Sequence, residues 1–358
     1  MIHLFEPLTL RSVTFRNRVW LPPMCTYQVD AHDGRATDWH LVHYGARATG
    51  GFGLLIVEAT AVVPEGRITM NDLGLWDDAQ VEGFARLTAF AHHYNAAVGV
   101  QLAHAGRKAS TWPDVPRFPD GYQSPADGGW EPVGPGADPF PGLGQPRALT
   151  TEEVAAIPAR FADAARRADA AGLDVVELHG AHGYLQTQFL SPLTNHRTDQ
   201  YGGSFENRTR LLRETVEAVR AVWPESKPLF LRISATEWTE GGWTVEDSVA
   251  LAEQVKPLGV DLVDVSSGGN VLADIPVAPG YHVTLAQAVR QGAGLPVAAV
   301  GLITEPAQAE QVLVTGQADA VLIGRAALRD PDWPETAAVA LGAPSPLAES
   351  YRRGSLKR

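Results

Sequence analysis

The sequence predicts an α/β protein, a (β/α)8 TIM barrel with a long capping insert after its third strand. Short apolar runs rich in β-formers recur eight times along the 358 residues, and helical patterns lie between them. Most of these runs are continuously apolar, which is typical of strands covered on both faces. Barrels of this length form one domain, so we expect residues 1–358 to be a single domain.

The eight expected strands follow one another along the whole chain. They are residues 19–24, 54–60, 98–104, 175–181, 228–234, 262–267, 296–301 and 320–325. An open doubly wound sheet is the competing fold. It usually has fewer strands and a Gly-x-Gly-x-x-Gly turn after the first one, and this turn is missing after Met24.

Helical patterns justify the segments between the strands. In residues 211–223, Leu212, Val216 and Val219 fall on one helical face. Residues 151–171 begin with Thr-Thr-Glu-Glu, a capping pattern, and Gly172 follows their end.

Two segments depart from this rhythm. Residues 105–150 are rich in Pro, Gly, Asp and Trp, and loops this long are uncommon unless they are functional or disordered. Their aromatic residues indicate a folded cap over the barrel mouth. Residues 343–358 form a C-terminal tail after the last expected helix.

Composition excludes several classes of protein. The chain is 45% hydrophobic and 20% charged, which is typical of soluble globular proteins. A net charge of -12 argues against nucleic-acid binding, and no apolar run approaches the length of a membrane span. The N-terminus lacks the pattern of a signal peptide, and one cysteine cannot form an internal disulfide. We therefore expect a cytoplasmic protein.

The most informative residues follow the fourth expected strand. His179, His182 and Tyr184 occur within six residues, with glycines between them. Imidazole can donate a hydrogen bond to a substrate oxygen, and a phenol can give up a proton. This set suits an enzyme that polarises a carbonyl and protonates a neighbouring carbon. A zinc site with Glu177 or His104 as third ligand is a less favoured alternative, and we expect no metal.

Catalysis in such barrels takes place at the carboxyl ends of the strands. Polar candidates there include Glu58, Gln101, Lys108, Arg232 and Ser266. Strands seven and eight end in Gly301 and in Gly324-Arg325, at the usual phosphate-binding corner of a barrel. A phosphate there would belong to a phosphorylated cofactor or substrate.

Motifs along nearly the whole chain resemble the Old Yellow Enzyme family of flavin-dependent ene-reductases. They are most similar to its thermophilic-like branch of bacterial NADPH dehydrogenases and xenobiotic reductases. Among them are Arg16-Asn17-Arg18, Pro22-Pro23-Met24-Cys25-Thr26-Tyr27, Gln101-Leu102-Ala103-His104-Ala105-Gly106-Arg107-Lys108, His179-Gly180-Ala181-His182-Gly183-Tyr184, Val265-Ser266-Ser267-Gly268-Gly269, Gly324-Arg325 and Tyr351-Arg352-Arg353-Gly354.

The resemblance implies a non-covalent FMN, with NADPH as reductant and small activated alkenes as substrates. The expected cofactor contacts are Pro22, Pro23, Met24, Cys25, Ala59, Gln101, Arg232, Ser267, Gly301, Gly324 and Arg325. In this arrangement Arg325 binds the phosphate, Gln101 meets the pyrimidine edge, and Arg232 stabilises the anionic reduced flavin. Pro22 stands where relatives often have a small polar residue.

The implied reaction reduces the C=C bond of α,β-unsaturated carbonyl or nitro compounds. His179 and His182 would bind the substrate oxygen, flavin N5 would deliver hydride to the β-carbon, and Tyr184 would protonate the α-carbon. Tyr27 would line the substrate pocket. Two alternatives are a metal-dependent barrel hydrolase or lyase that uses His179 and His182, and a flavoprotein without turnover.

The tail carries Tyr351 and Arg353, which the resemblance places in a substrate pocket. A tail extended from Gly342 onward could return to its own barrel mouth. The resemblance favours the pocket of a neighbouring subunit, so we expect a homodimer, or a homotetramer built as a dimer of dimers.

Overall fold

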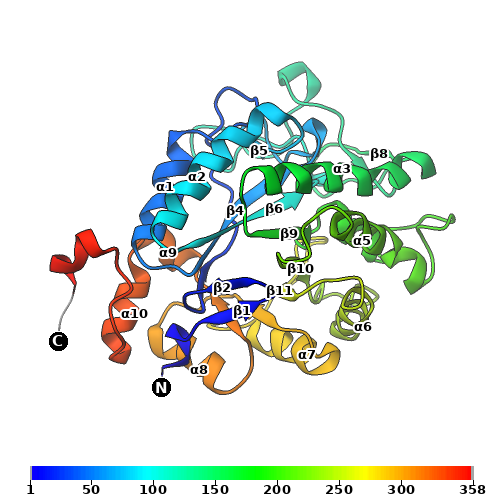
Figure 1. Cartoon of the computed structure of the whole chain (residues 1–358). Helices are drawn as coiled ribbons and strands as arrows, with labels where there is room; N and C mark the ends of the chain where they lie inside the picture. Colours follow the sequence, from blue (N-terminus) through cyan, green and yellow to red (C-terminus); the bar gives the residue numbers. More distant parts are fainter. Residues whose placement is uncertain (1, 356–358) are drawn as a thin grey trace.

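A closed parallel barrel forms the centre of the computed structural model, which describes residues 2–355. Its eight strands are β3 (Val19–Leu21), β4 (Leu54–Ala61), β6 (Ala97–Ala103), β9 (Val175–Gly180), β10 (Leu229–Ser234), β11 (Leu262–Ser266), β12 (Val297–Ala299) and β13 (Ala320–Leu322). The first barrel strand, β3, pairs in parallel with both β4 and the last strand, β13, which closes the sheet. The expected (β/α)8 fold is confirmed (Figure 1).

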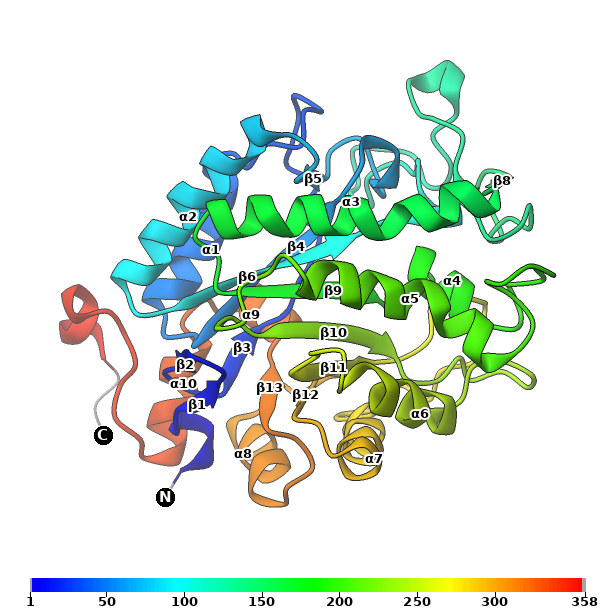
Figure 2. The ribbon, with the colours of Figure 1, turned by 45° about the vertical axis from the view of Figure 1, so that its right-hand side comes forward.

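Helices surround the barrel (Figure 2). They are α1 (Asp38–Thr49), α2 (Val81–His93), α3 (Thr151–Ala170), α4 (Leu185–Leu190), α5 (Phe205–Arg220), α6 (Val245–Val255), α7 (Val283–Ala293), α8 (Pro306–Val314), α9 (Arg325–Arg329) and α10 (Trp333–Leu341). Short 3-10 turns are η1 (His3–Phe5), η2 (Pro64–Gly66), η3 (Asp78–Gln80), η4 (Gly106–Lys108), η5 (Pro125–Asp127) and η6 (Glu349–Gly354).

Two helices test the sequence patterns directly. Helix α3 begins after Thr150, whose hydroxyl accepts from the Glu153 amide while the Glu153 carboxylate accepts from the Thr150 amide. This reciprocal capping box confirms the expected start. Helix α5 starts earlier than the expected residue 211, because Ser204 caps it through the Asn207 amide.

An N-terminal hairpin closes the amino end of the barrel. Its strands, β1 (Leu8–Leu10) and β2 (Val13–Phe15), precede the first expected strand. The Phe15 ring lies 4.8 Å from Trp20, and Trp20 stacks on Phe230 at 5.8 Å between centroids. These rings fill the amino end of the barrel, so the polar chemistry is confined to the carboxyl end.

The segment after β6 is folded. It contains η4, η5 and a two-residue ladder between β7 (Val133–Gly134) and β8 (Arg147–Ala148), while β5 (Leu73–Gly74) extends the edge of β4. The Trp130 indole donates to the Glu65 carbonyl at 2.8 Å, and the Arg67 guanidinium lies 5.2 Å from the Trp130 ring. Arg107 also donates to the Asp138 carbonyl. Within residues 2–355, no helix has both the length and the apolar character needed to cross a bilayer.

Candidate active site

The end of β9 brings three of the expected residues together. The His179 ring lies 5.2 Å from the His182 ring and 4.9 Å from the Tyr184 ring, edge to face in both cases. The chain turns through left-handed conformations at His182 and Gly183, with φ of 60° and 74°. A side chain at Gly183 would collide with the backbone of Gly269, so the close approach of this loop requires glycine.

Burial keeps both imidazoles neutral. It lowers the pKa of His179 and of His182 well below the ordinary value, and the cation of Arg232 lowers both further. His179 Nδ1 accepts from the Ala181 amide at 3.3 Å, which leaves the ring proton on Nε2. His182 Nε2 lies 2.8 Å from the Ser266 hydroxyl. We assign this hydroxyl as the donor, which leaves the His182 proton on Nδ1. Each ring thus keeps a hydrogen that can be donated to a substrate oxygen.

The Tyr184 phenol is held in its protonated form. Burial raises its pKa well above the ordinary value, and the neighbouring Cys25 and Asp72 raise it further. A protonated phenol beside two neutral imidazoles is a source of one transferable proton and three hydrogen-bond donors.

Lys108 links the loop after β9 to the loop after β11. Its ammonium donates to the carbonyls of His182 and Gly269, both at 2.9 Å, and lies 5.2 Å from the centre of the Tyr184 ring. Burial lowers the pKa of Lys108 to about 8, and Arg107 adds to the effect. Sequence reasoning named Lys108 as a candidate at a strand end but gave it no role. Its partners are backbone carbonyls far away in the chain, which a sequence pattern does not reveal.

The segment after β3 is fixed by a buried carboxylate. Glu58 accepts from both the amide and the hydroxyl of Thr26, with 2.8 Å for the hydroxyl, and lies 3.1 Å from His40 Nε2. Tyr27 follows in a left-handed conformation, with φ of 56°. Burial, with a further contribution from Cys25, keeps the pKa of Tyr27 above its ordinary value.

Cys25 faces the same apolar cluster as two other expected residues. Cys25 and Tyr184, from the end of β9, both pack against a small cluster that includes Ala59 of β4. Burial raises the pKa of the Cys25 thiol, as do the nearby carboxylates of Asp72 and Glu58. Cys25 is therefore a neutral thiol, which agrees with a role as neighbour of a cofactor and not as a nucleophile.

A buried polar layer crosses the barrel beneath these residues. The Gln101 amide donates to Glu177 at 2.8 Å, and Arg232 Nε lies 3.0 Å from Asp264. In the register of the parallel strands, Glu177 lies opposite Gln101, and Arg232 lies opposite His179 on one side and Asp264 on the other. Burial raises the pKa of Glu177 to about 8 and that of Asp264 to about 6. Asp264 is the buried partner that a lone arginine in an apolar strand requires.

The expected phosphate corner forms one cavity. Its lining includes Arg232 together with Gly301, Gly324 and Arg325 from the ends of the last two strands. Gly301 has a φ of 114°, and a Cβ there would come within 2.9 Å of His282. Pro22 and Met24 flank Gly324, each 3.6 Å from the position of a Cβ on that glycine. Pro23, between them, is buried.

The comparisons with known proteins show the family of the chain. The NADH:flavin oxidoreductase / NADH oxidase family matches residues 3–342. The chain belongs to this family. It is 47% identical over 352 residues to the NADPH dehydrogenase of Geobacillus thermodenitrificans and 45% identical over 352 residues to that of Bacillus subtilis. Each alignment covers 98% of both chains.

Solved structures of flavin oxidoreductases are similar over the whole barrel. An Old Yellow Enzyme homologue from Zymomonas mobilis superposes with a TM-score of 0.79 at 29% identity, covering 96% of this chain and 94% of that one. Morphinone reductase superposes with a TM-score of 0.78 at 31% identity, covering 97% and 91%. The expected family, an oxidoreductase activity, and the use of FMN and NADPH are therefore confirmed.

The described residues of this flavin oxidoreductase fit FMN. Gly301 and Gly324 line the corner with backbone and no side chain, and Arg325 supplies a cation beside them. Arg232 Nε makes no hydrogen bond of good geometry among residues 2–355, although its charge is balanced by Asp264. Gln101, oriented by Glu177, lies in the same layer. These residues would hold the phosphate and the polar edge of the flavin.

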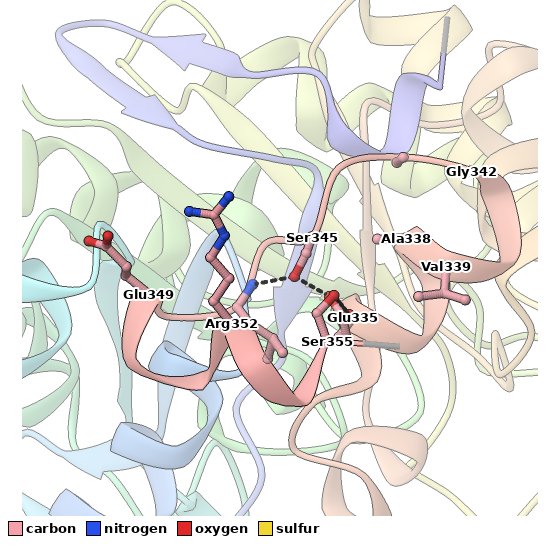
Figure 3. A pocket seen from close by; sticks show the side chains of 10 residues that line it. Glu335, Ala338, Val339, Gly342, Ser345, Glu349, Arg352 and Ser355 are labelled. Carbon is pink, nitrogen blue, oxygen red and sulfur yellow. Dashed lines mark hydrogen bonds between the residues drawn. The ribbon is translucent and has the colours of Figure 1, made fainter. Parts of the chain in front are cut away.

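Tyr351 and Arg353 are not brought to the site within one chain. The amide of Ala348 donates to the carbonyl of Thr49, the last residue of α1, which precedes the amino end of β4. The tail then lies along α10, where Ser345 and Ser355 both donate to Glu335 (Figure 3). Tyr351 is 54% exposed there. Residues 356–358 of the expected tail lie outside the described residues.

The zinc alternative receives no support from the side chains. Among residues 2–355, no three His, Cys, Asp or Glu side chains are grouped to hold a metal ion. His182 Nε2 and His179 Nδ1 already have hydrogen-bond partners within the fold.

Proposed function

We propose that this flavin oxidoreductase is an ene-reductase for α,β-unsaturated carbonyl and nitro compounds. The observation that carries the proposal is the convergence of His179, His182 and Tyr184 beside the flavin corner. Bound FMN supplies the hydride, accepted from NADPH and added to the β-carbon of the alkene.

The two imidazoles bind the carbonyl or nitro oxygen. His179 would donate from Nε2 and His182 from Nδ1, the nitrogens left free by the Ala181 amide and the Ser266 hydroxyl. Both hydrogen bonds strengthen as negative charge develops on that oxygen during the reaction, which stabilises the transition state more than the ground state.

Tyr184 provides the proton for the α-carbon. The raised pKa keeps the phenol protonated at neutral pH, and Lys108 lies near enough to favour the phenolate that remains after transfer. Tyr27 would form the opposite side of the substrate pocket, held by the turn that Glu58 fixes.

The experiment measures the two half-reactions separately in Tyr184→Phe. We expect flavin reduction by NADPH to remain near the wild-type rate and reoxidation by an enone such as 2-cyclohexenone to slow by roughly 10²–10⁴-fold. Tyr94→Phe is the matched control, since it removes the same hydroxyl at the end of α2 on the outside of the barrel. An unchanged reoxidation rate in Tyr184→Phe would exclude Tyr184 as the acid.

Ligand binding tests the two histidines without turnover. A phenol places an oxygen where the substrate oxygen would lie, and its binding shifts the flavin absorbance. His179→Ala and His182→Ala should each weaken phenol binding by roughly ten-fold or more while FMN stays bound. Wild-type phenol affinity in both variants would contradict the proposed oxygen site.

A further inference from the structure

A chain of three side chains, the half-buried Trp238 and the buried Ser267 and His282, leads from the loop after β10 to the phosphate corner. The Trp238 indole donates to the Ser267 hydroxyl oxygen at 2.8 Å, and that oxygen lies 2.8 Å from His282 Nε2. An indole N–H can only donate, so Ser267 accepts from Trp238. Among residues 2–355, His282 is the one acceptor recorded for the Ser267 hydroxyl hydrogen.

This chain fixes where the imidazole carries its proton. We assign the Ser267 hydroxyl as the donor to Nε2, because Nε2 is the acceptor within its reach among residues 2–355. With this direction, the hydrogen of the neutral His282 ring is on Nδ1. Burial lowers the pKa of His282 to about 4, and Arg232 also lowers it, so the ring is neutral near pH 7. The Tyr281 ring, 3.8 Å away between centroids, holds the imidazole in place.

The Nδ1 hydrogen of His282 is buried, and no protein atom among the described residues accepts it with good geometry. His282 is 3% exposed, and its Nδ1 makes no hydrogen bond among the described residues. The Val300 backbone lies close enough to favour the protonated ring, but it does not meet hydrogen-bond geometry. A buried donor without a partner is costly, so a ligand acceptor is expected here.

The surroundings indicate that this acceptor is an anion. His282 lines the same cavity as Gly301, Gly324 and Arg325, and its Nδ1 lies 2.9 Å from the position of a Cβ on Gly301. The Gly280 amide donates to the Gly301 carbonyl at 2.8 Å, which joins the two loops. Two arginines and no Asp or Glu occur among the residues that line the cavity.

We propose that His282 is a cofactor-binding residue, whose Nδ1–H donates a hydrogen bond to the phosphate group of FMN beside Gly301 and Arg325. Ser267 is then a positioning residue, which sets the tautomer of His282 and is itself oriented by Trp238. This assignment changes the expected role of Ser267 from a direct contact to an indirect one. It rests on FMN binding at this corner.

The test compares FMN with riboflavin, which lacks the phosphate. Flavin is removed from the protein, and the affinity of the apoprotein for each flavin is measured by fluorescence quenching. His282→Phe keeps an aromatic ring but removes both nitrogens, so FMN affinity should fall roughly ten- to a hundred-fold while riboflavin affinity stays near wild type. His282→Asn places an amide near the position of Nδ1 and should recover most of the FMN affinity.

Other outcomes overturn the proposal. An equal loss for FMN and riboflavin in His282→Phe would show a packing role only, and unchanged FMN affinity would show no role in binding. Failure of His282→Asn to exceed His282→Phe in FMN affinity would also contradict a donor at Nδ1. Tyr184→Phe should bind both flavins like wild type, so failure of the ene-reductase proposal would be seen in its reoxidation rate and not in these affinities.

Discussion

At the scale of single residues, the site holds its donors in uncharged forms. His179 and His182 are neutral because burial and Arg232 disfavour their protonation, and Tyr184 is protonated because burial disfavours phenolate. The sequence pattern named all three residues as candidates, and the fold brings their rings together. It could not give their protonation, which depends on burial and on charges from other strands.

These forms predict that His179, His182 and Tyr184 do not titrate in the alkene half-reaction between about pH 5.5 and 7.5. Any change of rate in this window would come from the buried carboxyl groups of Asp264 and Asp72, whose pKa values are about 6 and about 7. An imidazole with an ordinary pKa of about 6.5 would titrate within this window. Here the pKa of each histidine lies well below it, and that of Tyr184 lies well above it. Stopped-flow reoxidation with a non-ionising enone measures this rate directly. A change centred near pH 6.5 that disappears in His179→Ala or His182→Ala would show that the replaced histidine titrates normally.

Glu177 predicts a pH dependence of stability. Its pKa is raised from 4.5 to about 8 in the folded protein, so the folded state binds the extra proton between these values. The contribution is therefore present below about pH 4.5 and is lost as pH rises toward 8. Glu177→Gln cannot titrate at this position. From pH 5 to 8, the free energy of unfolding of wild type should fall relative to Glu177→Gln, by on the order of a few kcal/mol.

Denaturant midpoints at pH 5, 6, 7 and 8 measure this difference. Asp72 also has a raised pKa, but it is present in both proteins and largely cancels. Asp264 helps to raise the pKa of Glu177, so the measured difference belongs to this pair of carboxyl groups. A constant or growing advantage of wild type with rising pH would contradict a protonated Glu177.

At the scale of elements, sequence patterns predicted the barrel strands and missed a short hairpin and a contact between distant loops. All eight barrel strands were found, because a strand buried on both faces is continuously apolar. The β1–β2 hairpin was missed, since three-residue strands carry almost no periodic signal. The Lys108 bridge was missed for another reason, because its acceptors belong to two loops separated by more than 80 residues.

The loop after β9 predicts a difference between two glycines. Gly183 and Gly203 both have left-handed backbones, with φ of 74° and 84°. A Cβ at Gly203 meets no atom within 4 Å, whereas one at Gly183 collides with Gly269. Gly203→Ala should therefore cost about 1–2 kcal/mol of stability from backbone strain alone. Gly183→Ala should cost more and also weaken phenol binding, because His182 and Tyr184 would move.

Thermal unfolding and phenol titration of both variants, each loaded with FMN, separate the two effects. Equal destabilisation with normal phenol binding would show that the contact with Gly269 does not position the site.

At the scale of the whole molecule, one end of the barrel is structural and the other end holds the candidate site. Aromatic packing fills the amino end, and the cofactor and substrate groups gather at the carboxyl end. The tail packs at the amino end of its own barrel, beside the end of α1 (Figure 2). The sequence left open whether this tail returns to its own barrel mouth or enters the pocket of a neighbouring subunit. Its contacts with Thr49 and Glu335 hold it away from its own barrel mouth, which favours the neighbouring pocket. Exposed Trp39 and Val42 on α1 offer apolar surface for a second copy.

The last prediction concerns that second copy. If Arg353 completes the pocket of a neighbouring subunit, Arg353→Ala and Tyr184→Phe should each impair alkene reduction and should complement one another. In a hybrid dimer, one pocket combines the intact Tyr184 of one chain with the intact Arg353 of the other, while the second pocket has lost both. A purified hybrid should therefore recover about half of the wild-type activity. Each parent homodimer is the control. A verified hybrid no more active than its parents would exclude a shared pocket, and a monomer in sedimentation would exclude it independently.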